Sequence, residues 1–186
     1  MVRFHLLPYS HFMVHRNFIS LYYAVSMKIY VFIDEQNLYL SAKKQGWELN
    51  HKKLFRYLKD KYKVQKVFVF IGFITNRRSF YRELSSIGYN LVFKETSKYL
   101  ENGKVCYKGN VDSELVLHCA KIEYYRYDKA IIVSGDGDFK CLVQYLEKQE
   151  KLLRVLIPNK QSYSSLLYPF RRYMDFLSEQ KNRLRK

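Results

Sequence analysis

Acidic residues are few in this sequence. Seventeen Asp and Glu stand against 33 Lys and Arg, so the chain of 186 residues carries a formal net charge of +16. A chain this basic is expected to meet a polyanion. Nucleic acid is the commonest such partner, because binding to its phosphates releases counterions. An acidic membrane surface fits less well, since the sequence shows no long helix with one basic face.

Cysteine is also rare, with only Cys106, Cys119 and Cys141. Their odd number and the lack of a CxxC pair argue against a disulfide framework and against a zinc knuckle. A reducing, cytoplasmic compartment fits this cysteine usage best. Cys119 and Cys141 fall in apolar helical patterns, which predicts two buried free thiols.

Long apolar runs, glycine and proline are scarce as well. No window approaches the ~18 apolar residues that a membrane-spanning helix needs, so we expect no membrane association. Seven glycines and three prolines exclude the collagen-like and low-complexity classes. The remaining class is globular, because 48% of the residues are hydrophobic and the chain is long enough for one domain with a real core.

Residues 1–26 differ in composition from the rest of the chain. They contain Arg3 and Arg16 but no Lys, Asp or Glu. Met27 stands just before the first strand-like run. We therefore expect residues 1–26 to be an N-terminal extension outside the fold, with Met27 as a natural start.

Apolar runs alternate with amphipathic stretches from Met27 onward. Nearly unbroken runs rich in Val, Ile and Phe are typical of parallel strands covered on both faces. The five predicted strands are 29–33, 67–71, 91–93, 130–133 and 152–157. The predicted helices are 51–62, 77–87, 111–125 and 139–149. This order predicts an α/β fold, a three-layer α/β/α sandwich around a mostly parallel five-stranded sheet.

Two segments depart from this alternation. Asn102-Gly103 between strand-like arms predicts a small β-hairpin insertion near residues 97–108. Residues 161–186 are rich in basic side chains and are expected to form a C-terminal helix. The main domain is accordingly expected to span residues 27–160.

Several of the few acidic residues lie at the ends of predicted strands or at the start of a predicted helix. Asp34 follows the first predicted strand, and Asp136 and Asp138 follow the fourth. Asp112 begins the helix that leads into that fourth strand. Ligands of open parallel sheets bind at the carboxyl ends of the strands, and neighbouring strands lie roughly 5 Å apart. The three segments are therefore predicted to converge at one edge of the sheet.

Each of these residues also has a purely structural interpretation. Asp138 can cap a helix that begins at Phe139, and Asp136 can belong to an ordinary turn. Asn37 can likewise cap a helix from Leu38. Their joint placement favours a site, because clustered carboxylates repel one another unless a cation compensates. Oxygen ligands without His or Cys favour Mg²⁺ or Mn²⁺ over zinc.

Basic and aromatic side chains are predicted near the same edge. They are candidates for contact with substrate phosphates, although each is also compatible with a solvated surface charge. The candidates are Arg77, Arg78, Lys98, Lys108, Lys140 and Lys160. Tyr99 and Tyr107 on the predicted hairpin offer rings on which bases can stack.

Three stretches of the chain together resemble a known family. They are Val31–Tyr39, Lys108–Leu115 and Ile132–Phe139. In order and spacing they resemble the NYN domain family, in its LabA-like group, a branch of the PIN-like nucleases. The resemblance covers about residues 28–160. It implies a PIN-like sheet, with the first strand beside the fourth, and a metal-dependent ribonuclease site.

The resemblance also implies roles for individual residues. By motif position, Asp34, Asp112 and Asp136 are similar to the core catalytic acids that bind the metal, and Asp138 is similar to a fourth, more peripheral acid. Asn37 is similar to a residue that orients the Asp34 loop or the substrate.

Ser134 is similar to a supporting hydroxyl of that family. Glu35 departs from the pattern, because the family usually has a small residue there, often Gly. Gly readily takes a positive φ. A Glu is therefore expected either to change the backbone of the loop or to add a carboxylate near the metal.

The leading hypothesis is a Mg²⁺- or Mn²⁺-dependent endoribonuclease in which metal-activated water attacks an RNA phosphodiester. The alternative is a non-catalytic RNA-binding or regulatory module that keeps the PIN-like fold. A protein-interaction scaffold is a third class, and it predicts no steep dependence of RNA affinity on salt. The sequence leaves open whether the chain forms a homo-oligomer.

Overall fold

Six parallel strands form the main sheet of the computed structural model, which describes residues 27–95, 97–101, 104–108 and 111–186. The strands are β1 (Ile29–Asp34), β2 (Lys66–Gly72), β3 (Asn90–Lys94), β6 (Lys129–Val133), β7 (Leu152–Ile157) and β8 (Met174–Phe176). Their order is β3-β2-β1-β6-β7-β8. Because β1 pairs with β6, the first and fourth predicted strands are neighbours, as the family resemblance implied. The expectation for residues 1–26 lies outside the described residues.

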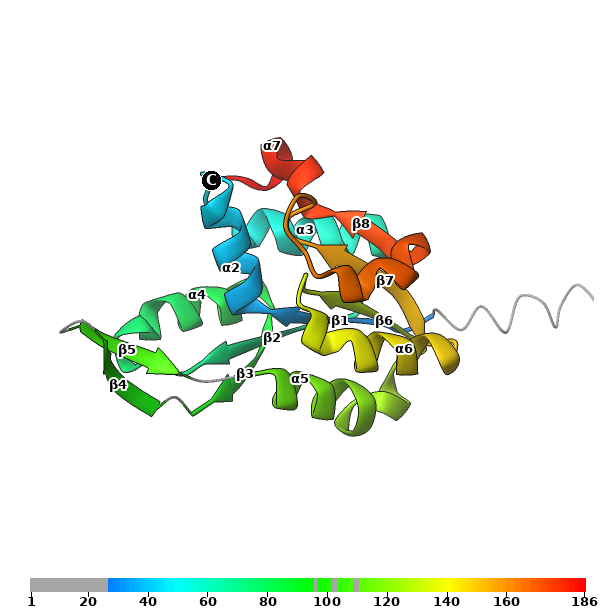
Figure 1. The fold of residues 1–186 in the computed structure, drawn as a ribbon, viewed down its shortest axis with the longest axis horizontal. Helices are drawn as coiled ribbons and strands as arrows, with labels where there is room; N and C mark the ends of the chain where they lie inside the picture. The colour runs from blue at the N-terminus through cyan, green and yellow to red at the C-terminus, as the bar shows by residue number, and fades with distance from the viewer. Residues whose placement is uncertain (1–26, 96, 102–103, 109–110) are drawn as a thin grey trace, which may run out of the picture.

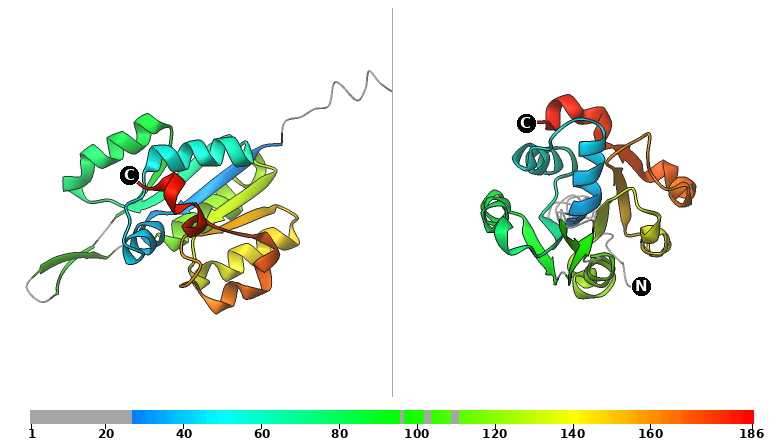
Figure 2. Two further views of the ribbon diagram at one scale, coloured as in Figure 1. Left: turned by 90° about the horizontal axis from the view of Figure 1, so that it is seen from above. Right: turned by 60° about the vertical axis from the view of Figure 1, so that its left-hand side comes forward.

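Helices cover both faces of this sheet (Figure 1). The α-helices are α2 (Glu35–Lys44), α3 (His51–Tyr62), α4 (Arg78–Ile87), α5 (Asp112–Leu117), α6 (Lys140–Lys148) and α7 (Lys181–Leu184). Alternate side chains of the central strand β1 enter different cores: Val31 and Ile33 lie in the core with α2, α3 and α4, whereas Phe32 lies in the core with α5 and α6. The predicted three-layer α/β/α sandwich is confirmed, and Figure 2 shows it from two further directions.

Local signals in the sequence explain several helix ends. Asn50 Oδ1 accepts a hydrogen bond of 3.0 Å from Lys53 N at the start of α3. Gly88 ends α4 with a φ of +112°, a conformation that glycine adopts without a Cβ clash. The helix predicted over 111–125 is shorter. It begins as α5 and continues as a π-helical turn (His118–Ile122) and a 3-10 turn (Tyr124–Arg126).

The segment after residue 160 differs from the expected helix. It contains the 3-10 stretch η5 (Ser165–Tyr173), then β8, the 3-10 turn η6 (Leu177–Gln180) and α7. Pro169 lies inside η5 and lacks the N–H that a continuous α-helix needs. β8 joins the edge of the sheet beside β7, which is why the sheet has six strands where the sequence predicted five.

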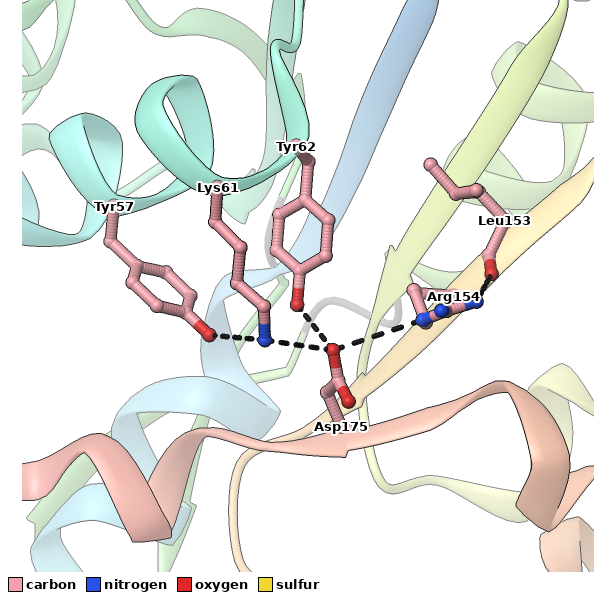
Figure 3. A network of polar contacts seen from close by, with 6 residues as sticks. All are labelled: Tyr57, Lys61, Tyr62, Leu153, Arg154 and Asp175. Atoms are coloured by element: carbon pink, nitrogen blue, oxygen red, sulfur yellow. Dashed lines mark hydrogen bonds and ion pairs between the residues drawn. The ribbon is translucent and has the colours of Figure 1, made fainter.

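A polar network around Asp175 ties β8 to α3 and β7 (Figure 3). Tyr62 Oη donates to Asp175 Oδ2 over 2.6 Å, and Lys61 Nζ donates to the same oxygen over 3.0 Å. Arg154 Nε lies 3.8 Å from Asp175 Oδ2. Lys61 Nζ also donates to Tyr57 Oη over 3.1 Å. Three cationic or hydroxyl donors therefore converge on one carboxylate of the C-terminal segment.

The predicted hairpin is confirmed. Strands β4 (Ser97–Glu101) and β5 (Lys104–Lys108) pair antiparallel as a separate two-stranded sheet. Figure 1 shows them extending from the end of the molecule near β3 and α4. The side chains predicted to contact RNA there, Lys98, Tyr99, Tyr107 and Lys108, lie outside what the structure describes.

The two described cysteines are both free thiols. Cys119 is buried, as predicted, but Cys141 is exposed. The prediction for Cys141 was wrong because α6 turns Leu142, Val143 and Leu146 into the core and leaves Cys141 on its solvent side. Within the described ranges, no helix has both the length and the apolar character needed to cross a membrane.

Candidate active site

Asp34 joins the ends of two neighbouring strands. It is the last residue of β1, it is buried, and its Oδ1 accepts from Asn37 N over 3.1 Å at the start of α2. Its Oδ2 accepts from Ser134 Oγ over 3.2 Å, and Ser134 directly follows β6. Parallel pairing of β1 with β6 thus brings together residues 100 positions apart. Asp34, and not Asn37 as the sequence suggested, caps the first helix.

Asn37 instead holds the loop after β6. Its Oδ1 accepts from Gly135 N over 2.9 Å. In the same loop Ser134 Oγ accepts from Asp136 N over 3.1 Å, and Asp136 Oδ1 accepts from Asp138 N over 3.0 Å. Asp136 is therefore the residue that caps the following 3-10 turn, η4 (Gly137–Phe139). These bonds fix Asp136 beside the Asp34 loop.

The glycine at position 137 allows close packing of this loop. A Cβ on Gly137 would lie 2.9 Å from Ser164 Cβ and would collide with Ser164 Oγ. Ser164 N in turn donates to Gly135 O over 2.9 Å. The residues after β7 thus press against the acidic loop, which explains why the loop contains residues without side chains.

The negative charges of two other acids act on Asp34. Burial is the main cause that raises the pKa of the Asp34 carboxyl from 3.8 to about 6. The hydrogen bonds from Asn37 and Ser134 lower this pKa, whereas the negative charges of Asp112 and Asp136 raise it. Asp112 belongs to the first turn of α5, on the opposite side of the sheet from α2. Asp112 and Asp136 thus lie near enough to Asp34 for their charges to act on it, and a shared metal site stays a prediction.

The other predicted site residues lie at the surface where the structure describes them. Asp138 is exposed, as are Arg77 and Arg78 beside the start of α4 and Lys140 at the start of α6. Lys160 Nζ donates to Glu179 Oε1 over 2.7 Å. The side chain of the remaining candidate, Lys108, is not described. The roles of all these residues stay predictions.

The donor set of the acidic cluster partly fits a metal ion. Carboxylate oxygens are the ligands that Mg²⁺ and Mn²⁺ prefer, and a cation would relieve the repulsion that Asp34 feels from Asp112 and Asp136. In the described part of the chain, however, no group of three or more His, Cys, Asp or Glu side chains is arranged to hold one ion. The charges of Asp112 and Asp136 thus act on Asp34, but the described side chains do not have the arrangement of a formed metal site.

Glu35, which was expected either to change the backbone of the loop or to add a carboxylate near the metal, has an ordinary helical backbone. In the described chain only Lys63 and Glu150 combine a side chain with a positive φ. The Glu35 side chain is buried, with Oε1 and Oε2 at 3.2 and 3.3 Å from His51 Nε2. Tyr89 Oη donates to His51 O over 2.9 Å. The sequence did not reveal this pair, because it joins two helices, and the only signal was an unusual Glu.

A cavity of about 620 Å³ lies next to Glu35, the residue after Asp34, and is bounded by α2, α3 and α4. Glu35 and His51 line it together with the aromatic side chains Trp47 and Phe80. The His51 and Phe80 rings meet edge to face at 5.3 Å. The cavity combines aromatic walls with the buried carboxylate of Glu35, which is hydrogen-bonded to His51, and apolar walls with a few placed polar groups are the usual composition of a ligand site.

This chain is similar in sequence to one known protein and in fold to another. The Low amplitude and bright protein LabA of Synechococcus elongatus is 23% identical over 155 residues, which are 80% of this chain and 83% of LabA. A crystal structure of a protein of unknown function from Vibrio parahaemolyticus superposes with a TM-score of 0.67 at 20% identity, covering 86% of this chain and 96% of that one. This second likeness shows the fold alone.

The family itself follows from a family model that matches most of the chain. The model of the NYN domain matches residues 28–175, which begins just before β1 and ends within β8. The match therefore includes Asp34, Asp112 and Asp136 and reaches into the strand that the sequence pattern missed. This chain belongs to the NYN domain family.

Proposed function

We propose that this protein is a metal-dependent ribonuclease that hydrolyses RNA phosphodiester bonds. The observation that carries the proposal is the buried Asp34, whose pKa is raised to about 6 beside Asp112 and Asp136. These three side chains would hold Mg²⁺ or Mn²⁺, with Asp138 as a peripheral fourth acid. A bound divalent ion supplies Lewis-acid polarisation of the phosphoryl oxygen and a nucleophile from water at neutral pH.

The remaining residues of the site have supporting roles in this proposal. Ser134 and Asn37 keep the two acidic loops in register through their bonds to Asp34 and to Gly135 N. The exposed cations Arg77, Arg78, Lys140 and Lys160, together with Lys108, attract the RNA backbone. The net charge of +16 strengthens this attraction at a distance.

The proposed partner and compartment follow from the same features. RNA is the partner that supplies both a phosphodiester and a polyanionic backbone. The free thiols of Cys119 and Cys141 fit a reducing environment, and we propose the cytoplasm as the place of action.

A non-catalytic RNA-binding module is the second candidate. This candidate is favoured because the carboxylates of the described residues are not arranged as the ligands of one metal ion. In that case the basic surface binds RNA, and the acids serve to cap α2 and η4. Both functions predict RNA binding, and only the first predicts cleavage.

A cleavage assay separates the two. Single-stranded and structured RNAs are incubated with the protein in Mn²⁺, in Mg²⁺ or in EDTA. We expect metal-dependent cleavage that falls by about 100-fold or more in Asp34→Asn and in Asp136→Asn. The matched control is Asp60→Asn, at an exposed position of α3, which should cleave like the wild type. Salt-sensitive binding without cleavage would establish the second candidate instead.

A further inference from the structure

The cavity beside the acidic cluster has the size of a ligand site. Its volume of about 620 Å³ falls within the range of about 300–1,000 Å³ that small-molecule sites occupy. Figure 1 shows its three bounding helices, α2, α3 and α4, on the same side of the sheet. No part of the proposed hydrolysis uses this space, so the cavity needs its own explanation.

The position of the cavity connects it to the acids. Glu35 lines it and directly follows Asp34, and Val111 lines it and directly precedes Asp112. An RNA phosphate held at the acids would therefore place a neighbouring nucleotide at the cavity. Arg77, also on its lining, is exposed and can meet the backbone of that nucleotide.

The cavity holds a carboxylate with unused acceptor capacity. Both oxygens of the buried Glu35 lie near a single donor, His51 Nε2, at 3.2 and 3.3 Å. Because His51 Nε2 is almost equally far from both oxygens, it occupies the side of the carboxylate between them, and each oxygen keeps an outward-facing lone-pair site open. His51 also fixes the carboxylate in place, because it belongs to the first turn of α3 and its carbonyl is held by Tyr89 Oη.

The chemistry of the walls selects the kind of ligand. Phe80, Trp47 and the His51 ring offer aromatic surface for a flat group. The carboxylate of Glu35 can only accept hydrogen bonds, so a ligand that contacts it must supply N–H or O–H donors. Among the four RNA bases, only guanine presents two adjacent donor groups, N1–H and the 2-amino group, which can both donate to one carboxylate oxygen on the side that His51 leaves open.

We propose that this cavity binds a guanine base of the substrate RNA and that Glu35, positioned by His51, is the residue that recognises it. The inference rests on the proposed function for its substrate class, RNA. It gives a purpose to the buried Glu35 and its contact with His51, which the proposed hydrolysis does not use. It also makes the site selective for sequence, which the acidic cluster alone cannot be.

Binding of short RNAs without metal tests this directly. The full chain is titrated in EDTA against fluorescein-labelled UUGUU, UUAUU, UUCUU and UUUUU, and anisotropy gives each Kd. The four RNAs carry the same phosphates, so the common electrostatic contribution cancels. We expect UUGUU to bind about tenfold tighter than the other three.

Removing one functional group from the RNA provides a test that needs no variant protein. Inosine lacks the 2-amino group of guanine and therefore offers only one of the two donors. With the wild-type chain, we expect the inosine analogue of UUGUU to bind about fivefold more weakly than UUGUU itself.

Two matched variants identify the residue. Glu35→Gln should bind all four RNAs with nearly equal affinity, because the amide replaces one acceptor by a donor. Glu48→Gln is the control, since Glu48 also lines the cavity but is exposed and pairs with Lys186. It should keep the preference for guanine. A thermal melt of each variant confirms that it is folded.

The outcomes separate this inference from the proposed function. Equal affinities of the wild type for all four RNAs, or inosine bound as tightly as guanine, would overturn the inference even if RNA is cleaved. A guanine preference that survives in Glu35→Gln would also overturn it. A guanine preference that Glu35→Gln abolishes would support it even if no cleavage is found. Failure to bind any RNA would overturn both proposals.

Discussion

Two carboxylates on the same sheet have opposite surroundings. Asp34, at the end of β1, is buried and lies near the like charges of Asp112 and Asp136. Its two hydrogen bonds do not compensate, and its pKa stays raised at about 6. This carboxylate is held in an environment that disfavours its charge.

Asp175, in β8 at the edge of the sheet, has the reverse environment. Burial alone would raise its pKa, but the hydrogen bonds from Tyr62 and Lys61 and the charge of Arg154 lower it (Figure 3). The same network raises the pKa of Tyr62, through burial first and through its bond to Asp175. This carboxylate is satisfied by the protein itself.

The difference separates a structural acid from a candidate functional one. Donors surround an acid whose task is to hold two elements together, so its ionised form stabilises the fold. An acid that remains uncompensated in a basic protein is a candidate for binding a cation. Four changes test this contrast, beginning with the largest expected effect.

Asp175→Ala is expected to lower the free energy of unfolding by about 3 kcal/mol, because Tyr62 and Lys61 lose a charged acceptor. Urea unfolding measures this value. Glu179→Ala is the control, since it removes an exposed pair with Lys160 and should change stability by at most about 0.5 kcal/mol. Equal decreases in the free energy of unfolding in the two variants would contradict a structural role of Asp175.

Asp34→Asn is expected to raise the free energy of unfolding by about 2 kcal/mol in EDTA near neutral pH. A rise in pKa from 3.8 to about 6 corresponds to about 3 kcal/mol, and part of this gain is offset by a weaker hydrogen bond with Ser134. Asp60→Asn, at an exposed position, should leave stability unchanged. A marked loss of stability in Asp34→Asn would mean that Asp34 serves only to cap α2.

The pH dependence should have opposite signs at the two acids. The folded pKa of Asp34 is raised, so its destabilising effect grows as pH rises from about 4 to about 6 and is absent below that range. The gain from Asp34→Asn should therefore vanish near pH 4. The pKa of Asp175 is lowered from 3.8. The ionised Asp175 therefore stabilises the fold above pH 3.8, and this stabilisation is lost as the pH falls below 3.8. Urea unfolding of Asp34→Asn and Asp175→Ala at several pH values up to about 6 measures how each substitution changes the free energy of unfolding with pH. The same sign of pH dependence in both variants would contradict the difference between the two acids.

Tyr62→Phe is expected to lower the free energy of unfolding by about 1 kcal/mol, because it removes the 2.6 Å hydrogen bond to Asp175. Tyr57→Phe removes only an acceptor of Lys61 and should cost less than about 0.5 kcal/mol. Urea unfolding of the two variants side by side measures the difference. A larger loss in Tyr57→Phe would mean that the network does not centre on Asp175.

Much of the fold was readable because its signals are local. Unbroken runs rich in Val, Ile and Phe, such as Val67–Ile71, are typical of strands covered on both faces, and Asn50 and Gly88 mark helix ends through their own chemistry. The approach of Asp34 to Asp136 was also predictable, since adjacent parallel strands end at one edge of the sheet.

The features that were missed depend on distant partners. Met174–Phe176 has no pattern of its own and becomes a strand only through pairing with β7 and the contacts of Asp175. Cys141 lies in an apolar stretch, yet the rotation of α6 exposes it. Glu35 and His51 are 16 positions apart on different helices, so no spacing rule predicts their contact.

Binding of Mn²⁺ in the absence of RNA, measured by isothermal titration calorimetry, tests most directly whether the three acids form one site. We expect the wild type to bind Mn²⁺ and each of Asp34→Asn, Asp112→Asn and Asp136→Asn to weaken that binding by about tenfold or more, whereas Asp175→Asn leaves it unchanged. Equal Mn²⁺ affinity in all five proteins, or no binding by the wild type, would contradict a shared metal site.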